Sequence, residues 1–594
     1  MRSTAAKTES TAGIAPKASS SELERSYHLL RISCWGVALT LGALDAWAAR
    51  FTMFPDGVAY LDVGDAFWRG DWHNAISAYW SPLYPWTLGF FLKIFKPSSY
   101  WEYPLVHLVN FLFYVAALAC FEFFLREFIE HTRPGIADVD REIALPEWAW
   151  YVAGYSAFVV SALFLITVRF PSGDMAVEGV IFVASALILK IRGGKATSRM
   201  FTVLGLVLGI GYLAKAVMFL MSAPFLVVAA AANWRVTGDP KSALRMAGIS
   251  ALFFAFAASP FVLSLSREKG RPTFGDSGKI NYAMSVNKVQ FFIPEGTSAK
   301  HPVRRLAALP RAFEYATPVG GTYPLWFDPS YWHEGIEPHF SLAQQLRMLG
   351  LSALTCAWIS FNIFLGLVMS TAIFVLYLVA PGIWRCLILA RQRWELWIPA
   401  VAGIGLYFLV VIEPRYVAAL FCLLWLVGLS GVRLPAGTSS RRLIAGIVIA
   451  LAGTTSLISL WQSSRAARGV EMGEKHIATP ICWRLADALR SFGLQPGDKI
   501  AVVATWLVPD QEASYVARLA RVRIVAEARP EEFWGADDST RLKFASEVAQ
   551  AGAGAILAYQ PPRSPPGWER LAGSDYYVFR TRPPANGPAT VQSK

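Results

Sequence analysis

Long apolar runs separated by short basic loops dominate the chain up to residue 461. A helix that crosses a bilayer needs about 20 mostly apolar residues, and Lys and Arg collect in the loops on the cytoplasmic side. With this charge bias, the runs predict about eleven crossings and a cytoplasmic N-terminus. The predicted spans are residues 29–54, 103–125, 148–168, 175–191, two short helices within 201–234, then 247–265, one span within 349–384, and 397–412, 416–431 and 443–461.

Two polar stretches and both chain ends break this pattern. Residues 55–102 and 266–348 are polar enough to be predicted as outer loops of a membrane domain that covers residues 29–461. Residues 1–28, rich in Ser, Thr, Ala and Lys, are predicted to be a disordered cytoplasmic tail, and residues 586–594 a second disordered tail. Residues 1–28 contain no cleavable signal pattern, which favours a retained anchor in the first span.

Residues 462–585 return to a soluble composition. Helical periods at 482–492, 515–520 and 539–551 alternate with strand-like runs at 499–504, 523–526 and 555–559, and residues 576–580 fit an edge strand. This alternation predicts a small, separate α/β domain with a mostly parallel sheet. The odd number of predicted crossings places this domain on the extracytoplasmic side. There is no His beyond residue 476, so no nucleophilic or metal chemistry is expected in it. Covering a site, guiding an acceptor and a purely structural role all stay open.

Composition agrees with a multi-pass membrane protein. Of the 594 residues 54% are hydrophobic and only 16% are charged, whereas soluble domains carry about 25% charged residues. The net charge of +13 lies largely in short loops between spans, which indicates topology and contact with anionic lipid rather than a nucleic-acid partner. Five of the six cysteines fall in or beside apolar spans and no pair has metal spacing, and Cys482 stands alone in the tail.

The most informative residue is Asp56, which directly follows the first span. Tyr60 and Asp62 come next, and the Pro/Tyr-rich segment Ser81-Pro82-Leu83-Tyr84-Pro85-Trp86 follows about twenty residues after them. Most outer-loop acids merely cap a short helix, and that interpretation stays open for Asp56.

Two further motifs lie downstream. The glycine-rich run 205–218 contains Lys215, and Glu413-Pro414-Arg415-Tyr416 opens a late span. Together with the first outer loop, this ordered set resembles the GT-C glycosyltransferases, which include the protein O-mannosyltransferases and the lipid A aminoarabinose transferases. One departure is that Arg415-Tyr416 is followed by Val-Ala-Ala rather than by the usual prolines of that superfamily.

The resemblance implies an α-helical polytopic membrane enzyme that moves a sugar from a polyprenyl-phosphate donor to an extracytoplasmic acceptor. It implies that Asp56 is the catalytic carboxylate. No cofactor is expected. Residues assigned to substrate binding under this hypothesis are Tyr60, Asp62, Asp174, Lys215, Glu413, Arg415 and Tyr416.

Sugar transfer from a polyprenyl-phosphate donor requires residues of these types. Lys215 and Arg415 would neutralise the donor phosphate, Arg through a forked pair of hydrogen bonds and Lys as a point charge. Asp56 would take the proton of the acceptor hydroxyl, and a single base with direct displacement inverts the anomeric centre. Simpler interpretations stay open: a snorkelling interfacial Lys215, an Arg415 paired with Glu413 or a lipid headgroup, and an Asp174 that stabilises a helix start.

A divalent metal is an alternative hypothesis for the second outer loop, since carboxylate and imidazole are ordinary zinc or manganese ligands. Its candidate ligands are Asp328, His333, Glu334, Glu337 and His339, whose spacing fits no standard signature.

Two rival functions also remain, a transporter or flippase for lipid-linked sugars and a non-catalytic membrane scaffold. A transporter would carry charges near the bilayer midplane, often in two related halves, but here they gather at outer helix ends and no repeat is visible.

Overall fold

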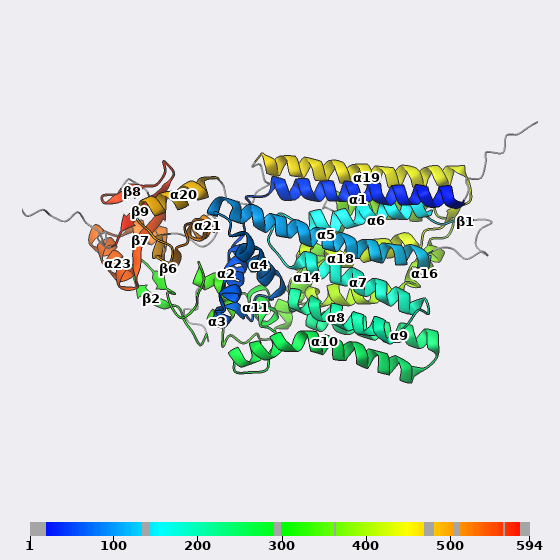
Figure 1. The fold of residues 1–594 in the computed structure, drawn as a ribbon, viewed down its shortest axis with the longest axis horizontal. Coiled ribbons are helices and arrows are strands. Elements are labelled where there is room, and N and C mark those ends of the chain that lie inside the picture. Colours follow the sequence, from blue (N-terminus) through cyan, green and yellow to red (C-terminus); the bar gives the residue numbers. More distant parts are fainter. Residues whose placement is uncertain are drawn as a thin grey trace, which may run out of the picture.

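A bundle of long helices forms one end of the molecule and a small sheet with its own helices forms the other (Figure 1). The computed structural model describes residues 20–132, 142–289, 299–361, 364–468, 480–503, 511–561 and 565–581. The bundle helices are α1 (Ser20–Ala48), α5 (Ser99–Thr132), α6 (Glu147–Val159) with the π-helix η2 (Val160–Ile166), α7 (Asp174–Arg192), α8 (Ser198–Ala214), α9 (Met218–Thr237), α10 (Pro240–Glu268), α14 (Leu342–Phe361), α15 (Phe364–Val379), α16 (Ile383–Arg391), α17 (Trp394–Phe408), α18 (Pro414–Ser430) and α19 (Thr438–Ala467).

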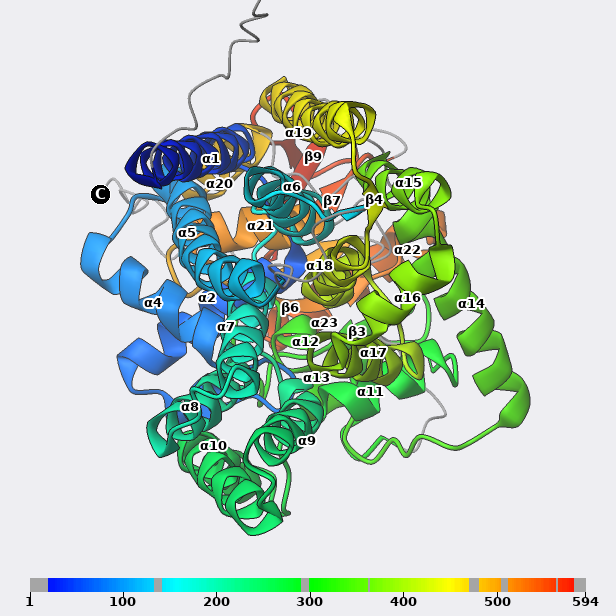
Figure 2. The ribbon, with the colours of Figure 1, turned by 90° about the vertical axis from the view of Figure 1, so that its right-hand side faces the viewer.

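The bundle arrangement brings distant parts of the sequence together. Seen along the helices, α1 lies beside α19 at one flank, α8, α9 and α10 form the opposite flank, and α7 and α18 lie between them (Figure 2). The apolar core is continuous through these helices. At the far end from the sheet, β1 (Glu142–Ile143) pairs antiparallel with β4 (Leu434–Pro435).

Each predicted span coincides with a helix, but the number of crossings stays a prediction. Among the described residues, six helices are long and apolar enough to cross a membrane, and the pair α14 and α15, bent by 74°, makes a seventh if it counts as one span. Three of the other four predicted spans, α8, α17 and α18, are shorter apolar helices. The fourth, α7, has 19 residues and carries charge near both ends.

The prediction of disorder is wrong for residues 20–28, because α1 begins at Ser20. Residues 1–19 and 586–594 lie outside the part of the chain that the structure describes.

The first outer loop folds into three helices, α2 (Pro55–Arg69), α3 (Trp72–Ala75) and α4 (Leu83–Phe95). Proline at the first position and an acid in the first turn favour the start of α2, and Gly70 ends it in the left-handed conformation with φ 80°. The backbones of α2 and α4 meet closely, because a Cβ on Gly64 would lie 2.3 Å from the Pro85 carbonyl oxygen. Helices α2 and α4 therefore pack directly against each other.

The second outer loop contributes to two parts of the molecule. Helices α11 (Ser277–Ser285), α12 (Pro324–Phe327) and α13 (Pro329–Trp332) lie near the first loop, while β2 (Arg304–Ala307) and β3 (Ala312–Glu314) join the C-terminal sheet. In Figure 1, β2 accordingly lies beside the C-terminal strands and away from the bundle.

The C-terminal region has the predicted alternation of helices and strands. Its elements are α20 (Pro480–Ser491), β5 (Lys499–Val503), α21 (Gln511–Ala520), β6 (Arg523–Ala528), α22 (Pro530–Gly535), α23 (Asp538–Gln550), β7 (Ala553–Tyr559), β8 (Trp568–Arg570) and β9 (Tyr576–Arg580).

The sheet itself differs from the prediction in three ways. Its order is β2-β3-β6-β5-β7-β9-β8, so two strands come from the second outer loop and the tail does not form it alone. Only β5 with β6 and β5 with β7 are parallel, and the other four pairings are antiparallel. Strand β9 is not an edge, because β8 pairs on its outer side. The hydrophobic pattern of the tail carried no information about β2 and β3, which lie about 200 residues upstream.

Candidate functional site

A cavity of about 870 Å³ lies between the helix bundle, the two outer loops and the C-terminal sheet. Helices α2, α4 and α11 lie between the bundle and the sheet in Figure 1, which is where these parts converge. Seven of the eight residues predicted from the sequence line this cavity: Asp56, Tyr60, Asp174, Lys215, Glu413, Arg415 and Tyr416.

Asp56 lies in the first turn of α2 and is 7% exposed. Its Oδ1 accepts a hydrogen bond from the indole nitrogen of Trp326 at 3.1 Å. Burial raises the pKa of the Asp56 carboxyl above its usual range; Arg415 and the Trp326 hydrogen bond oppose the rise, whereas negative Glu413 and Asp174 add to it. A carboxylate with a raised pKa is a stronger base, which suits removal of a proton from a hydroxyl group.

Two cations and two carboxylates form a group that we call the cavity cluster: Asp174, Lys215, Glu413 and Arg415. The Lys215 ammonium forms an ion pair with Asp174 Oδ1. The Nε of Arg415 lies 2.7 Å from Glu413 Oε2 and 3.9 Å from Asp174 Oδ2. Asp174 is 5% exposed and therefore acts as a buried anchor between the two cations.

Tyr416 forms a face of this cluster. The Lys215 Nζ lies 3.6 Å from the centre of its ring and the Arg415 Cζ 5.1 Å, so both cations are within cation–π range. The ring of Tyr407 stacks on Tyr416 at 5.1 Å. The side chains of Lys215 and Arg415 stay 26% and 20% exposed, which leaves both cations accessible from the cavity.

Local sequence explains why these residues meet. Lys215 is at the break between α8 and α9, where it has an extended backbone, so its side chain leaves the helix axis. Gly173 lets the start of α7 approach that break, because a Cβ there would lie 2.8 Å from the Ala214 carbonyl oxygen. Pro414 starts α18 and places Arg415 in its first turn.

Aromatic rings cover much of the remaining wall. Tyr60 packs edge-on against Trp80 at 5.0 Å and against Tyr84 at 5.2 Å, and Trp80 lies 6.1 Å from Trp326. Burial raises the pKa of the Tyr60 hydroxyl, with negative Asp56 adding to the shift, so Tyr60 stays a neutral hydrogen-bonding group. Flat rings with polar tips suit a ligand that has both apolar faces and hydroxyl groups.

Asp62 does not line the cavity. Its carboxylate accepts hydrogen bonds from the Thr322 backbone nitrogen at 2.7 Å and from Arg518 Nη1 at 2.7 Å. Arg518 also bonds Asp65 at 2.8 Å and Glu102 at 2.7 Å, and Arg521 pairs with Glu102 at 2.5 Å. These residues, Asp62, Asp65, Glu102, Arg518 and Arg521, connect α21 to α2 and α5, and we call them the docking cluster.

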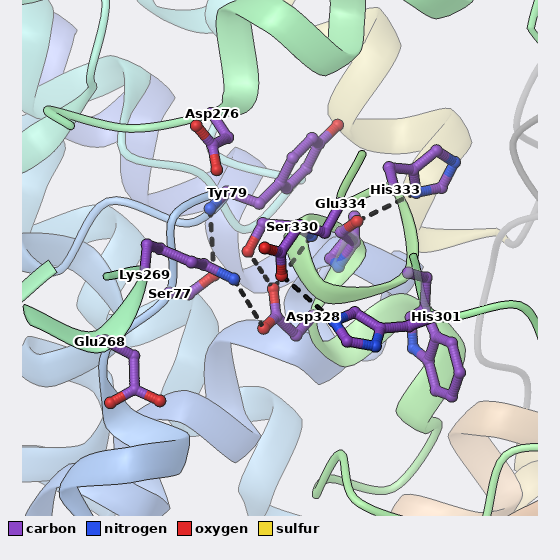
Figure 3. A network of polar contacts seen from close by, with 12 residues as sticks. Ser77, Tyr79, Glu268, Lys269, Asp276, His301, Asp328, Ser330, His333 and Glu334 are labelled. Carbon is purple, nitrogen blue, oxygen red and sulfur yellow. Dashed lines mark hydrogen bonds and ion pairs between the residues drawn. The ribbon is translucent and has the colours of Figure 1, made fainter. Parts of the chain in front are cut away.

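The structure does not bring the five candidate metal ligands together. Within the described residues, no group of three or more His, Cys, Asp or Glu side chains is arranged to hold a metal ion. Figure 3 shows Asp328 near Ser330 and Lys269, and Glu334 near His301. The Nδ1 of His333 lies 2.9 Å from the Pro329 carbonyl oxygen.

The last two candidates also have other partners. Glu337 pairs with Lys279 at 2.6 Å, and the backbone nitrogen of His339 donates to Asn287. Four of these side chains and the backbone of His339 therefore have structural contacts within the second loop.

Several cavity residues were not predicted, and three of them are Tyr323, Trp326 and Glu527. Tyr323-Pro324-Leu325-Trp326 repeats the Pro-Leu-aromatic character of Ser81–Trp86, and this similarity was a usable signal. Glu527 has no comparable signal, since its place depends on the pairing of β6 with β5 and β3.

No family model matches this sequence, and no curated protein matches it. The crystal structure of ArnT from Cupriavidus metallidurans bound to undecaprenyl phosphate is 12% identical and aligns with a TM-score of 0.50 over 95% of this chain and 99% of that chain. The apo state of ArnT from the same organism is 13% identical, with a TM-score of 0.49 over 93% and 98% of the two chains. The Archaeoglobus fulgidus oligosaccharyltransferase in complex with Zn and sulfate is 12% identical, with a TM-score of 0.44 over 89% and 68%. The fold predicted from the sequence resemblance, a GT-C-like multi-pass helical protein with a small strand-containing C-terminal region, is confirmed.

Proposed function

We propose that this protein transfers a sugar from a polyprenyl-phosphate donor to a hydroxyl group of an extracytoplasmic acceptor, with inversion at the anomeric carbon. The observation that carries the proposal is one cavity that holds a buried carboxylate, Asp56, beside two accessible cations, Lys215 and Arg415. The GT-C-like fold adds to it, since ArnT from Cupriavidus metallidurans was crystallised with undecaprenyl phosphate, a lipid of the proposed donor class.

In this mechanism Lys215 and Arg415 bind the donor phosphate, and Asp174 keeps the two cations at fixed positions. The acceptor oxygen forms a bond to the anomeric carbon while the bond from that carbon to the phosphate oxygen breaks. The electron pair leaves with the polyprenyl phosphate, whose added charge the two cations stabilise. The proton of the acceptor hydroxyl passes to Asp56, so no metal or cofactor is required for the balance of the step.

Mass spectrometry of envelope glycans and lipids tests this function in cells whose only copy of the protein carries Asp56→Asn. Asparagine keeps the shape and can still accept from Trp326, but it is not a base. We expect one glycoconjugate to disappear and its donor lipid to accumulate, while the protein inserts into the membrane at normal levels. An unchanged set of glycoconjugates would overturn the proposal, and a donor lipid trapped on one side of the membrane would support the transporter instead.

A further inference from the structure

The cavity has two chemically different walls. Lys215 and Arg415 belong to the bundle wall, whereas the C-terminal region contributes Val502, Ala513, Ser514, Ile524 and Glu527. Among these described lining residues of the C-terminal region, Glu527 is the one that carries a charge. A carboxylate in the C-terminal part of the lining requires an explanation, because it does not bind the phosphate.

Glu527 is fixed by two hydroxyl groups from the second outer loop. Its Oε2 accepts hydrogen bonds from the hydroxyls of Tyr315 and Tyr323, each at 2.9 Å. Burial raises the pKa of both tyrosines, with negative Glu527 adding to the shift, so both hydroxyls stay protonated donors. The carboxylate is therefore held in one position and only 6% exposed, and Tyr323 shares the same cavity lining.

The backbone of β6 turns Glu527 toward the cavity. Ile500 of β5 pairs with Ile524, but the next residue, Ala501, pairs with Ala526, so β6 contains one extra residue at Val525. Side chains alternate between the two faces of a strand, and an extra residue reverses that alternation. Consequently the side chains of Glu527 and Ile524 lie on the same face of β6, and both line the cavity.

The direction of the proposed reaction assigns a role to this wall. In an inverting displacement the acceptor oxygen attacks from the side opposite the departing phosphate. With the phosphate at Lys215 and Arg415, the acceptor must approach on the side of the cavity remote from those cations. The segment 323–326 connects the two acids, since Trp326 donates to Asp56 and Tyr323 donates to Glu527.

We propose that Glu527 binds a hydroxyl group of the acceptor, and that the acceptor is a neutral, hydroxyl-rich glycan segment rather than a phosphate group. This inference rests on the proposed function and names its acceptor class. A sugar hydroxyl donates to a fixed carboxylate, and the nearby rings of Tyr323 and Trp326 suit the apolar face of a sugar. A phosphate acceptor would be repelled by the same carboxylate at close range.

The test combines Glu527→Gln and Glu527→Ala with the exposed Glu569→Gln as a matched control in the same region. The donor lipid that accumulates in Asp56→Asn cells serves as the binding probe for the purified proteins. We expect both Glu527 variants to bind this lipid with unchanged Kd, which also shows that they are folded. In cells, the rate of product formation should fall about 10- to 100-fold, the range for loss of one hydrogen bond to a charged group. Glu569→Gln should match the wild type.

Three results would overturn the assignment. The first is full product formation by Glu527→Gln, and the second is a tenfold or larger loss of donor-lipid binding by either Glu527 variant. The third is a product whose new bond is a glycosyl phosphodiester rather than a glycoside of a hydroxyl group. An Asp56→Asn strain that lacks no glycoconjugate is a different failure, because it removes the proposed function itself.

Discussion

The cavity cluster and the docking cluster are both built from carboxylates and cations but differ in access to the cavity. In the cavity cluster, Lys215 and Arg415 keep about a fifth to a quarter of their side chains exposed. In the docking cluster, Arg518 is 4% exposed and contacts three carboxylates at 2.7–2.8 Å. An accessible cation can exchange a carboxylate for a phosphate, whereas a fully enclosed one holds two parts of the molecule together. Exposure, more than composition, distinguishes the cluster proposed to bind phosphate from the docking cluster.

The contrast also explains the different positions of two acids on one helix. Asp56 and Asp62 both belong to α2, and both contact the segment 322–326, through Trp326 and Thr322. Asp56 opens into the cavity beside Arg415, while Asp62 contacts Arg518 of α21. The docking cluster therefore fixes the helix that carries the proposed base.

The largest expected effect is the loss of catalysis when the carboxylate of Asp56 is removed. Asp56→Asn should lower kcat about 10²- to 10⁴-fold, the usual contribution of a positioned base, with the melting temperature of the purified protein within a degree or two of wild type. Transfer assays with the accumulated donor lipid and thermal unfolding measure the two quantities. Normal turnover by this variant would exclude Asp56 as the base and leave the cavity without its proposed catalytic group.

For the docking cluster, we expect a loss of stability rather than a direct loss of catalysis. Arg518→Met removes the guanidinium that the buried carboxylate of Asp62 contacts and leaves Glu102 with Arg521 alone. It should destabilise the junction by about 3–5 kcal/mol. Limited proteolysis should then release the C-terminal region at concentrations of protease that leave the wild type intact. The control is Arg570→Met, which removes an exposed pair with Asp575 and should cost about 0–1 kcal/mol. Equal protease resistance in all three proteins would contradict a docking role.

A smaller effect is expected for the cations of the cavity cluster. Lys215→Ala and Arg415→Ala should each weaken binding of undecaprenyl phosphate about 10- to 100-fold, as for loss of one charge-assisted contact. Arg415→Lys should recover only part of the affinity, because an ammonium cannot replace a forked guanidinium. Titration of the purified variants with this lipid measures the change. Native affinity in both alanine variants would assign the cations to structural or lipid contacts.

Local sequence located Asp56, Lys215 and Arg415 because each lies at the end of an apolar run, and hydropathy detects such ends. It could not show that Asp62 faces Arg518, since the two are 456 residues apart and no period in the sequence encodes that contact. The strands β2 and β3 were missed for the same reason: they are short, and their place is set by pairing with β6. Glu527 combines both difficulties, because its orientation depends on one extra residue in a strand.

The smallest and most diagnostic effect is on the pH dependence of transfer. A general base works only when deprotonated, so kcat should fall as the pH drops through the pKa of Asp56, and burial raises that pKa above its usual range. The Trp326 hydrogen bond lowers this pKa and negative Glu413 raises it. Trp326→Phe should therefore move the acidic limb to higher pH, whereas Glu413→Gln should move it to lower pH. Profiles of kcat against pH for the wild type and the two variants measure the position of the acidic limb. Shifts of both variants in the same direction would exclude Asp56 as the titrating base.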